Sequence, residues 1–466
     1  MPRASLSQLD RPMFLRQLST DEYAPLPYSR RDKLVVAKTR QRLVDAAAER
    51  RVALSTLAEG RAATAAGLRA LNEECGEEFF RVPDDAVRDD AAASAVFDGP
   101  ELVIDVQTHF MAPHCQQTVT PQFISGAMQA VMPEWWTEMD DLVSYDLATF
   151  IKSVFLDCEN GVAVLTSGPG LDDLRHLFND EMAATRALVD GLAGTGRLLS
   201  HAVVHPNVDG ELDAMEAYRD ELHPAGWKVY TLGVFTPDGT SALDWSLTDD
   251  DGYRFLERAR SLDVNLICAH KGISLLVDNG SPRDIGPAAK AFPDLEFLVY
   301  HSGYELPIYA PPEGPYTEET ADQGVNRLIK SVEDSGIGRG GNVYAELGTT
   351  WFSLIRRPEE AAHVLGKLIA TFGEDNVIWG TDSIWYGSAQ PLIDAFRVFQ
   401  IPDRMCEQYG YSPLTAEVRD KILSLNAARV YGIDVAQMRD RVKTDDLGWA
   451  REIVRDYEKS GFNALH

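Results

Sequence analysis

The chain has 466 residues, of which 45% are hydrophobic and 25% are charged, as in an ordinary globular protein. Its net charge of −28 argues against binding to nucleic acid, because an acidic surface repels phosphate groups. It contains no apolar run of about 18 residues, the length that a membrane-spanning helix needs. The length allows one large domain with an extension, or two domains.

The cysteines are scattered, odd in number and without a CxxC pair, which fits a reducing compartment better than a disulfide framework; they are Cys75, Cys115, Cys158, Cys268 and Cys406. Arg30 and Arg31 resemble a twin-arginine export signal. The segment after them is charged and lacks the apolar region that export requires. We therefore expect a cytoplasmic protein.

The N-terminal part reads as a polar arm followed by helix. Residues 1–30 are rich in Pro, Ser and charge, and apolar positions then recur at helical spacing from about Arg31 to Cys75. Gly60 and Gly67 interrupt this run, which predicts two helices or one kinked helix. We divide the chain into an N-terminal extension (1–95), a main domain (96–440) and a C-terminal helical tail (441–466).

After residue 100, short apolar runs alternate with amphipathic segments, which predicts βαβ units and a parallel sheet. Eight such units over about 280 residues fit a (β/α)₈ TIM barrel, which typically takes about 250. A doubly wound open sheet is the rival, but no glycine-rich phosphate fingerprint follows the first strand. The expected strands are 102–107, 161–167, 198–205, 226–233, 264–270, 296–301, 342–348 and 376–382.

The first of these strands, LVIDVQTHF, turns polar at its end. Asp105, Gln107 and His109 occupy alternate positions, so they point the same way out of the strand. Polar residues also close later strands, because His205, His270, His301 and Asp382 end the third, fifth, sixth and eighth. In a parallel barrel the carboxyl ends of all strands meet on one face, where these side chains can converge.

Two or three imidazoles with a carboxylate form a ligand set for one divalent metal ion, with zinc expected and manganese or iron as alternatives. Such an ion polarises a carbonyl or activates a bound water. Taken singly, each residue also has a structural explanation: a strand-end His is commonly a hydrogen-bonded core residue, and Asp382 could cap a helix. His205 is equally well explained by a turn with Pro206, so the joint pattern carries the prediction.

Other residues near the expected site are open to two interpretations. Lys228 could bridge two metals if carbamylated, but we favour a charge at the edge of the pocket or a structural ion pair. Glu346 on the seventh strand is expected to enter the pocket. Lys271 could hold a substrate carboxylate, although a solvated lysine is commoner. Aromatic residues suit a flat substrate, or are simply core packing; we place Phe110, Tyr304, Trp351 and Trp385 at the substrate, with Trp135 and Trp136 nearby.

Residues 100–435 resemble the amidohydrolase superfamily, in particular the branch that contains both hydrolases and non-oxidative decarboxylases such as aminocarboxymuconate semialdehyde decarboxylase. The resemblance rests on IDVQTHF, AHKG, FPDLEFLVYHSG, IWGTDS and the closing KILSLNAARVYGI, in this order. It implies that His109, His270 and Asp382 are metal ligands. It further implies that His301 is an acid/base or holds the catalytic water, and that Asp382 accepts a proton.

Gln107 departs from this pattern, because the family has a His or Glu ligand at that place. An amide oxygen is a weaker ligand than imidazole or carboxylate. Gln107 is thus a weak ligand, a substrate contact, or the mark of a site that has lost its metal.

Three functions follow from the sequence. We favour hydrolysis of a C–N, ester or lactone bond of a small aromatic or cyclic substrate, catalysed by His301 and Asp382. The alternative is decarboxylation of an aromatic or unsaturated acid, and a metal-free, non-catalytic barrel is the third. Residues 111–155 are predicted to form a lid-like insertion after the first strand. We expect a homodimer or higher homo-oligomer, with the N-terminal helices covering the barrel or pairing subunits.

Overall fold

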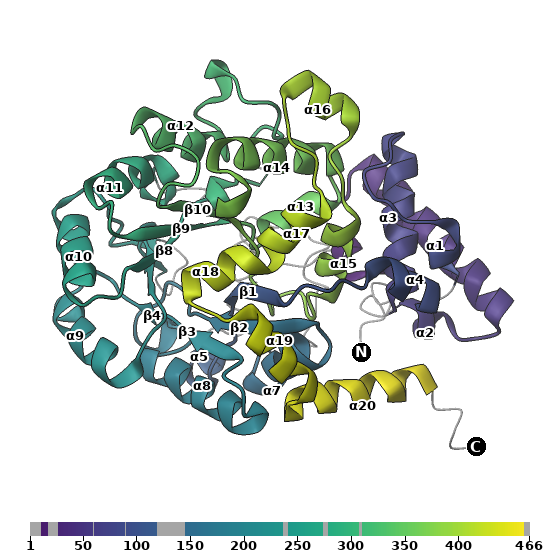
Figure 1. The fold of residues 1–466 in the computed structure, drawn as a ribbon, viewed down its shortest axis with the longest axis horizontal. Helices are drawn as coiled ribbons and strands as arrows, with labels where there is room; N and C mark the ends of the chain where they lie inside the picture. Colours follow the sequence, from purple (N-terminus) through teal and green to yellow (C-terminus); the bar gives the residue numbers. More distant parts are fainter. Residues whose placement is uncertain are drawn as a thin grey trace.

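The computed structural model describes residues 11–16, 27–58, 60–88, 90–118, 145–235, 241–273, 278–306 and 310–460. Its centre is a parallel sheet that closes on itself, with helices around the outside (Figure 1). The strands are β1 (Val103–Thr108), β2 (Asn160–Leu165), β3 (Leu198–Ser200), β4 (Ala202–Val203), β5 (Trp227–Tyr230), β8 (Leu266–His270), β9 (Glu296–Tyr300), β10 (Val343–Glu346) and β11 (Val377–Ile378).

Two sheets make up this barrel, with the orders β1-β2-β3 and β11-β10-β9-β8-β5-β4. They join at His201, which separates β3 from β4 and whose N–H donates to Leu165 O at 3.0 Å. They join again where Asp382 N donates to Gln107 O at 2.9 Å and His109 N donates to Ser383 O at 2.6 Å. With β3 and β4 counted as one interrupted strand, all eight predicted strands are present, and the (β/α)₈ prediction is confirmed.

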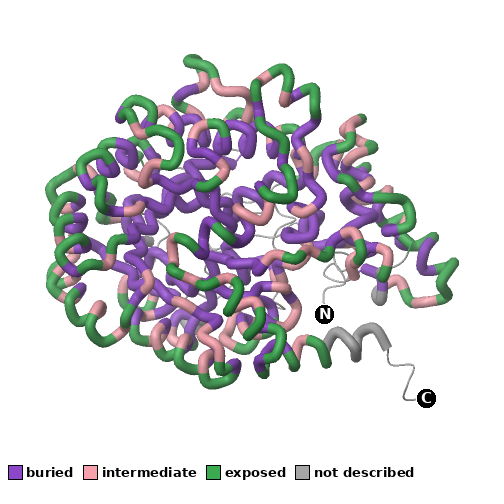
Figure 2. The backbone as a smooth tube through the Cα atoms, in the orientation of Figure 1, coloured by how far each residue is buried: buried purple, intermediate pink, exposed green. Residues whose placement is uncertain are grey.

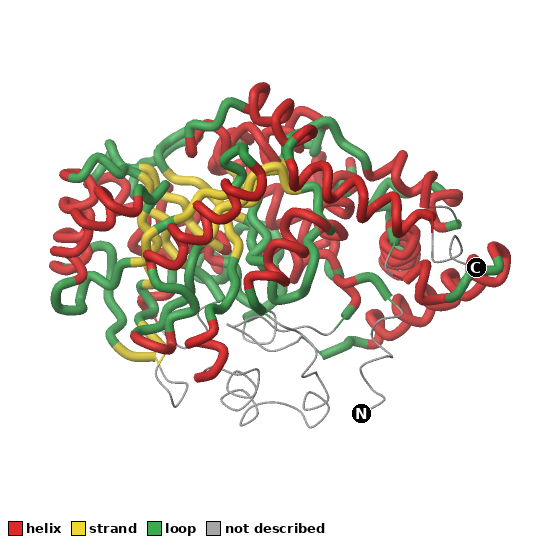
Figure 3. Tube along the Cα trace, turned by 90° about the horizontal axis from the view of Figure 1, so that it is seen from below, coloured by secondary structure: helices red, strands yellow, loops and turns green. Residues whose placement is uncertain are grey.

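Amphipathic helices cover the outer face of the barrel, so the strands and the inner sides of these helices are buried (Figures 2 and 3). From β2 to β10, with β3 and β4 counted as one strand, each barrel strand is followed by one main helix. In chain order these helices are α8 (Asn179–Ala193), α9 (Glu211–Ala217), α10 (Asp250–Ser261), α11 (Ile285–Ala291), α12 (Asn326–Asp334) and α14 (Pro358–Phe372). Helices α15 (Gln390–Val398), α16 (Asp403–Tyr409), α17 (Ala416–Asp420) and α18 (Asn426–Tyr431) follow β11. The smaller elements near the site are α5 (Pro113–Thr118), α7 (Leu147–Ile151), α13 (Thr350–Ile355) and the antiparallel pair β6 (Val234–Phe235) and β7 (Ser241–Ala242).

The N-terminal extension contains α1 (Arg30–Arg50), α2 (Leu54–Ala58), α3 (Arg61–Cys75) and α4 (Asp90–Phe97). A capping box between Ser29 and Asp32 begins α1. Gly60 caps the start of α3, as the sequence suggested, whereas Gly67 lies inside α3 and does not interrupt it. A Cβ at Gly67 would lie 3.0 Å from the ring of Phe14, so the glycine lets this ring pack on the helix.

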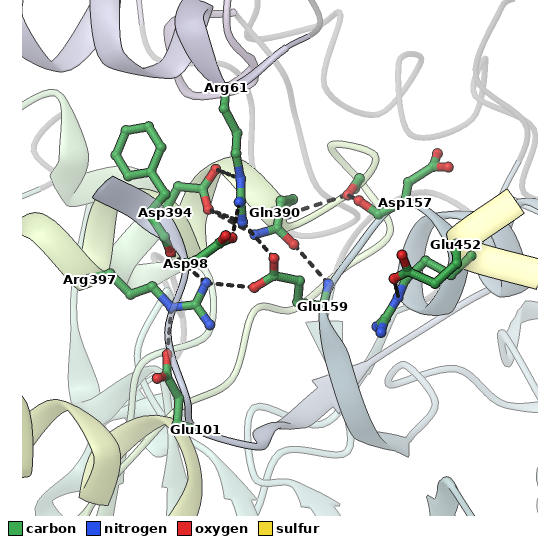
Figure 4. A network of polar contacts seen from close by, with 12 residues as sticks. Arg61, Asp98, Glu101, Asp157, Glu159, Gln390, Asp394, Arg397 and Glu452 are labelled. Carbon is green, nitrogen blue, oxygen red and sulfur yellow. Dashed lines mark hydrogen bonds and ion pairs between the residues drawn. The ribbon is translucent and has the colours of Figure 1, made fainter. Parts of the chain in front are cut away.

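Helices α3 and α4 pack on α15, on one side of the barrel (Figure 1). Phe80 pairs with Phe399 in an antiparallel bridge, and the centroids of their rings lie 5.4 Å apart. Between these helices lies a group of charged and amide side chains that we call the seam network (Figure 4), made of Arg61, Asp98, Glu101, Glu159, Gln390, Asp394 and Arg397. The extension thus shares its core with the barrel.

The last described elements are α19 (Val435–Thr444) and α20 (Asp446–Ser460). The predicted lid, residues 111–155, lies largely outside the described residues, together with Trp135 and Trp136. No helix in the described ranges has the length and apolar character needed to cross a membrane.

Candidate functional site

Five polar residues meet where the parallel strands end, and we call them the site cluster: Gln107, His109, His270, His301 and Asp382. Gln107 lies in β1 and His109 directly follows it, β8 ends at His270, and His301 and Asp382 follow β9 and β11. Each of the five side chains is at most 2% exposed. The structure brings these five side chains together because parallel strands bring their carboxyl ends to one face.

Asp382 is the centre of the hydrogen bonds. Its Oδ1 accepts from Gln107 Nε2 at 2.9 Å and contacts His109 Nε2 at 3.0 Å, and its Oδ2 accepts from the Thr349 hydroxyl. Burial alone would disfavour the charged carboxylate, but the hydrogen bond and charge of His109 outweigh burial and lower the pKa of Asp382 to about 2. Asp382 is therefore ionised at neutral pH.

The two remaining histidines lie edge to face, with ring centroids 4.7 Å apart. Tyr230 stacks on the other side of His270 at 5.0 Å. Burial, and next the nearby charge of Lys228, lower the pKa of His270 well below its ordinary value, so this imidazole is neutral at pH 7. A neutral imidazole is the form that can bind a metal ion or accept a proton.

His301 is held in one tautomer. Its Nδ1–H donates to Gly348 O at 2.8 Å, which leaves Nε2 as the basic nitrogen. The backbone here is strained, because His301, Thr349 and Asp382 adopt positive φ angles of 62°, 53° and 60°. Such left-handed conformations cost about 1–3 kcal/mol each for residues other than glycine, and they concentrate at functional sites.

The donor set can be tested against a divalent ion. Among the described residues, no three His, Cys, Asp or Glu side chains lie close enough together to hold one. Gln107 adds a third donor beside His109 and Asp382, and its buried Oε1 has no hydrogen-bond partner within the described part of the chain. Turning this amide by half a turn exchanges its nitrogen and oxygen and aims the oxygen at the place where the other two donors meet. His270 interacts electrostatically with both His109 and Asp382. By chemical type, two imidazoles, a carboxylate and an amide oxygen suit a metal such as zinc or manganese.

Two of the predicted substrate residues lie at this site. Trp385 stacks on His109 with ring centroids 5.7 Å apart. Phe110 packs on Phe150 at 5.3 Å, in an apolar cluster that also contains Tyr230. The two rings belong to different apolar clusters of the core.

The other three predicted substrate residues are engaged elsewhere. Lys271, predicted to hold a substrate carboxylate, is fully buried and forms an ion pair with Asp284 at 2.7 Å. The hydroxyl of Tyr304 accepts from Arg357 at 2.7 Å. Trp351 donates to Leu392 O at 2.9 Å and packs against α15. Each of them therefore stabilises a contact between the barrel and its own helices.

The sequence left the roles of Asp105, Lys228 and His205 open, and the structure shows the contacts of each. Asp105 accepts from the Thr381 hydroxyl at 2.6 Å and from two backbone N–H groups, so it joins β1 to the end of β11. Lys228 is buried, with its Nζ 3.5 Å from the ring centroid of Tyr300, which favours the structural interpretation. His205 is buried beyond β4, and none of the residues that the structure describes forms a hydrogen bond with its Nε2.

Sequence reasoning missed three contributors. Thr349 binds Asp382, Gly348 holds His301, and His176, from the loop after β2, packs edge-on against Trp385 at 5.4 Å. Burial lowers the pKa of His176 to about 3. The available signal was position alone, because all three lie in loops at the carboxyl ends of strands.

Comparison with known proteins agrees with this fold. The family model described as "Amidohydrolase" matches residues 179–433. No curated protein matches the chain.

The solved structures that match this chain are distant in sequence. A 2,6-dihydroxybenzoate decarboxylase complexed with 2,6-dihydroxybenzoate is 15% identical, with 71% of this chain and 99% of that one covered and a TM-score of 0.45. A structure assigned to a 2-pyrone-4,6-dicarboxylic acid hydrolase from Pseudomonas putida is 16% identical, with 72% and 98% covered and a TM-score of 0.42. A 5-carboxyvanillate decarboxylase from Novosphingobium aromaticivorans, complexed with manganese, is 15% identical, with 72% and 97% covered and a TM-score of 0.43.

Proposed function

Because the chain belongs to the amidohydrolase family, we propose that it is a metal-dependent carboxy-lyase, which removes the carboxyl group of a small aromatic or unsaturated acid as CO₂. The observation that carries this proposal is the burial of the whole site cluster at 2% exposure or less. A carboxylate that leaves water for such a site loses its hydration, whereas the CO₂ that it releases is neutral. A water-poor site therefore assists decarboxylation more than it assists attack by water.

The side chains divide the work as follows. His109, His270 and Asp382, with the Gln107 amide, would hold the ion, which supplies positive charge to the oxygens of the substrate. The rings of Trp385, which stacks on His109, and of Phe110 suit a flat substrate.

His301 moves the proton. Its Nε2 takes up a proton and delivers it to the carbon that loses CO₂, so that the electron pair of the broken C–C bond becomes a C–H bond. The Gly348 carbonyl keeps Nε2 aimed into the site throughout, because it holds Nδ1–H.

Hydrolysis, which the sequence favoured, is the second candidate. It is supported by the ionised Asp382, whose carboxylate lies beside His109 and can orient or deprotonate a water. A metal-free barrel without activity is the third possibility, and its support is the hydrogen bond from Gln107 to Asp382.

The test is a substrate panel on purified enzyme loaded with Zn²⁺ or Mn²⁺. One arm contains hydroxylated benzoates and unsaturated carboxylic acids, with CO₂ release as the readout; the other contains aromatic lactones, esters and amides, with acid release as the readout. We expect CO₂ from the first arm, and its loss in His301→Asn. Turnover confined to the second arm would establish hydrolysis, and no turnover in either arm with no bound metal would favour the inactive barrel.

A further inference from the structure

One buried carboxyl group adjoins the site cluster without belonging to it. Glu346, the last residue of β10, is fully buried, and its two oxygens point at two different turns. Oε2 accepts from the backbone N–H of His301 at 3.0 Å, and Oε1 accepts from the backbone N–H of Gly348 at 2.6 Å. The carboxyl group thus joins the turn after β9 to the turn after β10.

The imidazole of His301 joins these two turns a second time. Gly348 O accepts from Nδ1–H of His301 at 2.8 Å, so His301 is held by its backbone through Glu346 and by its side chain through Gly348. Glu346 also fixes Gly348, whose carbonyl sets the orientation of the imidazole. The three residues form a closed ring of hydrogen bonds.

The surroundings are shaped to admit this carboxyl group. A Cβ at Gly380 would lie 1.8 Å from Glu346 Oε1, and a Cβ at Gly348 would lie 2.6 Å from the same atom. The Gly348 Cβ would also lie 2.2 Å from Gln107 Oε1, so the carboxyl group and the Gln107 amide share one small space. Only glycine at both positions leaves room for Glu346.

The backbone on either side is strained where Glu346 holds it. His301 and Ser302 have φ angles of 62° and 54°, and Thr349, directly after Gly348, has 53°. The hydroxyl of Ser302 donates back to Glu346 O at 2.6 Å, which holds the first turn against the end of β10. Strain of this kind persists only where neighbouring contacts enforce it.

We propose that Glu346 is a positioning residue, which holds His301 and Gly348 so that the Nε2 of His301 faces the reacting atoms. It acts through these two residues and makes no contact with the substrate itself. The proposal rests on the catalytic role of His301 for its consequence in activity, but the geometry of the imidazole can be read without any substrate.

The first experiment therefore reads the tautomer of His301 by NMR in protein with ¹⁵N-labelled histidine, with the signal assigned through His301→Asn. The wild-type ring should be protonated at Nδ1 and basic at Nε2. Glu346→Gln keeps one accepting oxygen and should weaken this preference, and Glu346→Ala should abolish it and give a mixture of tautomers. Gly348→Ala disturbs the same ring of hydrogen bonds at Gly348 instead of at Glu346. It should also weaken the preference of His301 for the Nδ1-protonated tautomer, and it provides a second test if Glu346→Ala folds poorly.

The second experiment measures kcat and KM of the same variants on whichever substrate the panel identifies. Misplacing a catalytic group by about 1 Å costs on the order of 100-fold in rate, so kcat should fall by about 10- to 100-fold in Glu346→Gln with KM nearly unchanged. Tyr344→Phe is the matched control, because Tyr344 lies on the same strand and its hydroxyl contacts Arg429 at 3.0 Å, away from the site. It should leave both constants and the tautomer unchanged.

The outcome that overturns the proposal is a Glu346→Gln protein with a lowered melting temperature and an unaltered His301 tautomer, because Glu346 would then only stabilise the fold. Absence of any turnover would count against the proposed function, and the tautomer measurement would still decide the role of Glu346.

Discussion

The site cluster and the seam network both bury several ionisable groups, but they neutralise them in opposite ways. In the seam network, arginines face carboxylates: Arg61 contacts Glu159 at 2.6 Å and Asp394 at 3.1 Å, and Arg397 contacts Glu159 at 2.6 Å. In the site cluster, Asp382 is satisfied by an amide, a hydroxyl and an imidazole.

The difference lies in which protons can move. An arginine keeps its charge at any physiological pH, so the seam network can do little besides hold α3 and α4 against α15. Imidazoles and carboxyl groups in a low-dielectric site can gain or lose protons, and their neighbours determine whether the pKa of each group is raised or lowered. Buried charge therefore indicates chemistry only where its partner can change protonation.

The largest effect that we expect comes from His301→Asn. Asparagine tolerates the left-handed backbone of residue 301, so the fold should survive, while the loss of the proton carrier should reduce kcat by about 10²- to 10⁴-fold. The matched control is His223→Asn, because His223 is an exposed histidine with φ 47° that precedes the start of β5, whereas the site cluster lies at the carboxyl ends of the strands. Equal activity of the two variants would remove His301 from the mechanism.

In the seam network the corresponding change is Arg61→Ala, which leaves the carboxylate of Asp394 buried without its cation. Removing one partner of a buried ion pair typically costs about 3–5 kcal/mol in the free energy of unfolding. Urea denaturation should show this loss, while the kcat of the folded protein stays near the wild-type value. Arg254→Ala, which breaks the exposed pair with Asp251, should change stability by no more than about 1 kcal/mol. A large fall in kcat without a fall in stability would mean that the seam network serves the site directly.

The pH dependence of stability gives a finer test of the same network. Burial raises the pKa of Asp394 to about 6, in spite of the opposing charge of Arg61. Because this folded-state pKa lies above the unfolded one, the carboxyl group stabilises the fold at low pH, and the contribution is lost as pH rises through about 4 to 6. A shift of about two pKa units corresponds to about 3 kcal/mol.

Asp394→Asn should therefore flatten the stability curve between pH 4 and 6, measured by urea denaturation at each pH. The exposed Asp334→Asn serves as the control and should leave the slope as it is in the wild type. An unchanged slope in Asp394→Asn would show that this carboxyl group does not titrate in that window.

The barrel and most of the site cluster could be predicted because they depend on local patterns. Apolar runs marked the strands, and a polar residue after each run marked its carboxyl end, so His109, His270, His301 and Asp382 were found without knowledge of their contacts. The aromatic residues were harder: Trp385 lies at the site, but Trp351 packs on α15, and no sequence pattern separates the two.

The supporting contacts could not be predicted, because they join segments far apart in the chain. Glu346 was noticed as a strand residue, but its hydrogen bonds to His301 and Gly348 depend on how two turns meet. The left-handed backbone of His301 and Asp382 contradicts the usual preference of these residues and is imposed by tertiary contacts.

The smallest effect concerns Gln107, which stands where the resemblance drawn from the sequence implies a stronger metal ligand. Its Nε2 donates to the same oxygen of Asp382 that contacts His109, so the amide now competes with any cation for that oxygen. Gln107→His replaces the amide with a stronger ligand, and the affinity for Zn²⁺ should rise by about tenfold or more. Calorimetry and the metal content after dialysis measure this change without any substrate.

Gln107→Leu completes the comparison, because it removes both the donor and the acceptor. If Gln107 is a ligand, Gln107→Leu should bind Zn²⁺ more weakly than the wild type, and the order of affinity should be His, Gln, Leu. If the Gln107 amide only forms a hydrogen bond with Asp382, Gln107→Leu frees that carboxylate oxygen for the ion. The affinity of this variant for Zn²⁺ should then match or exceed that of the wild type. The position of Gln107→Leu in this order thus distinguishes a weak ligand from a competitor of the metal.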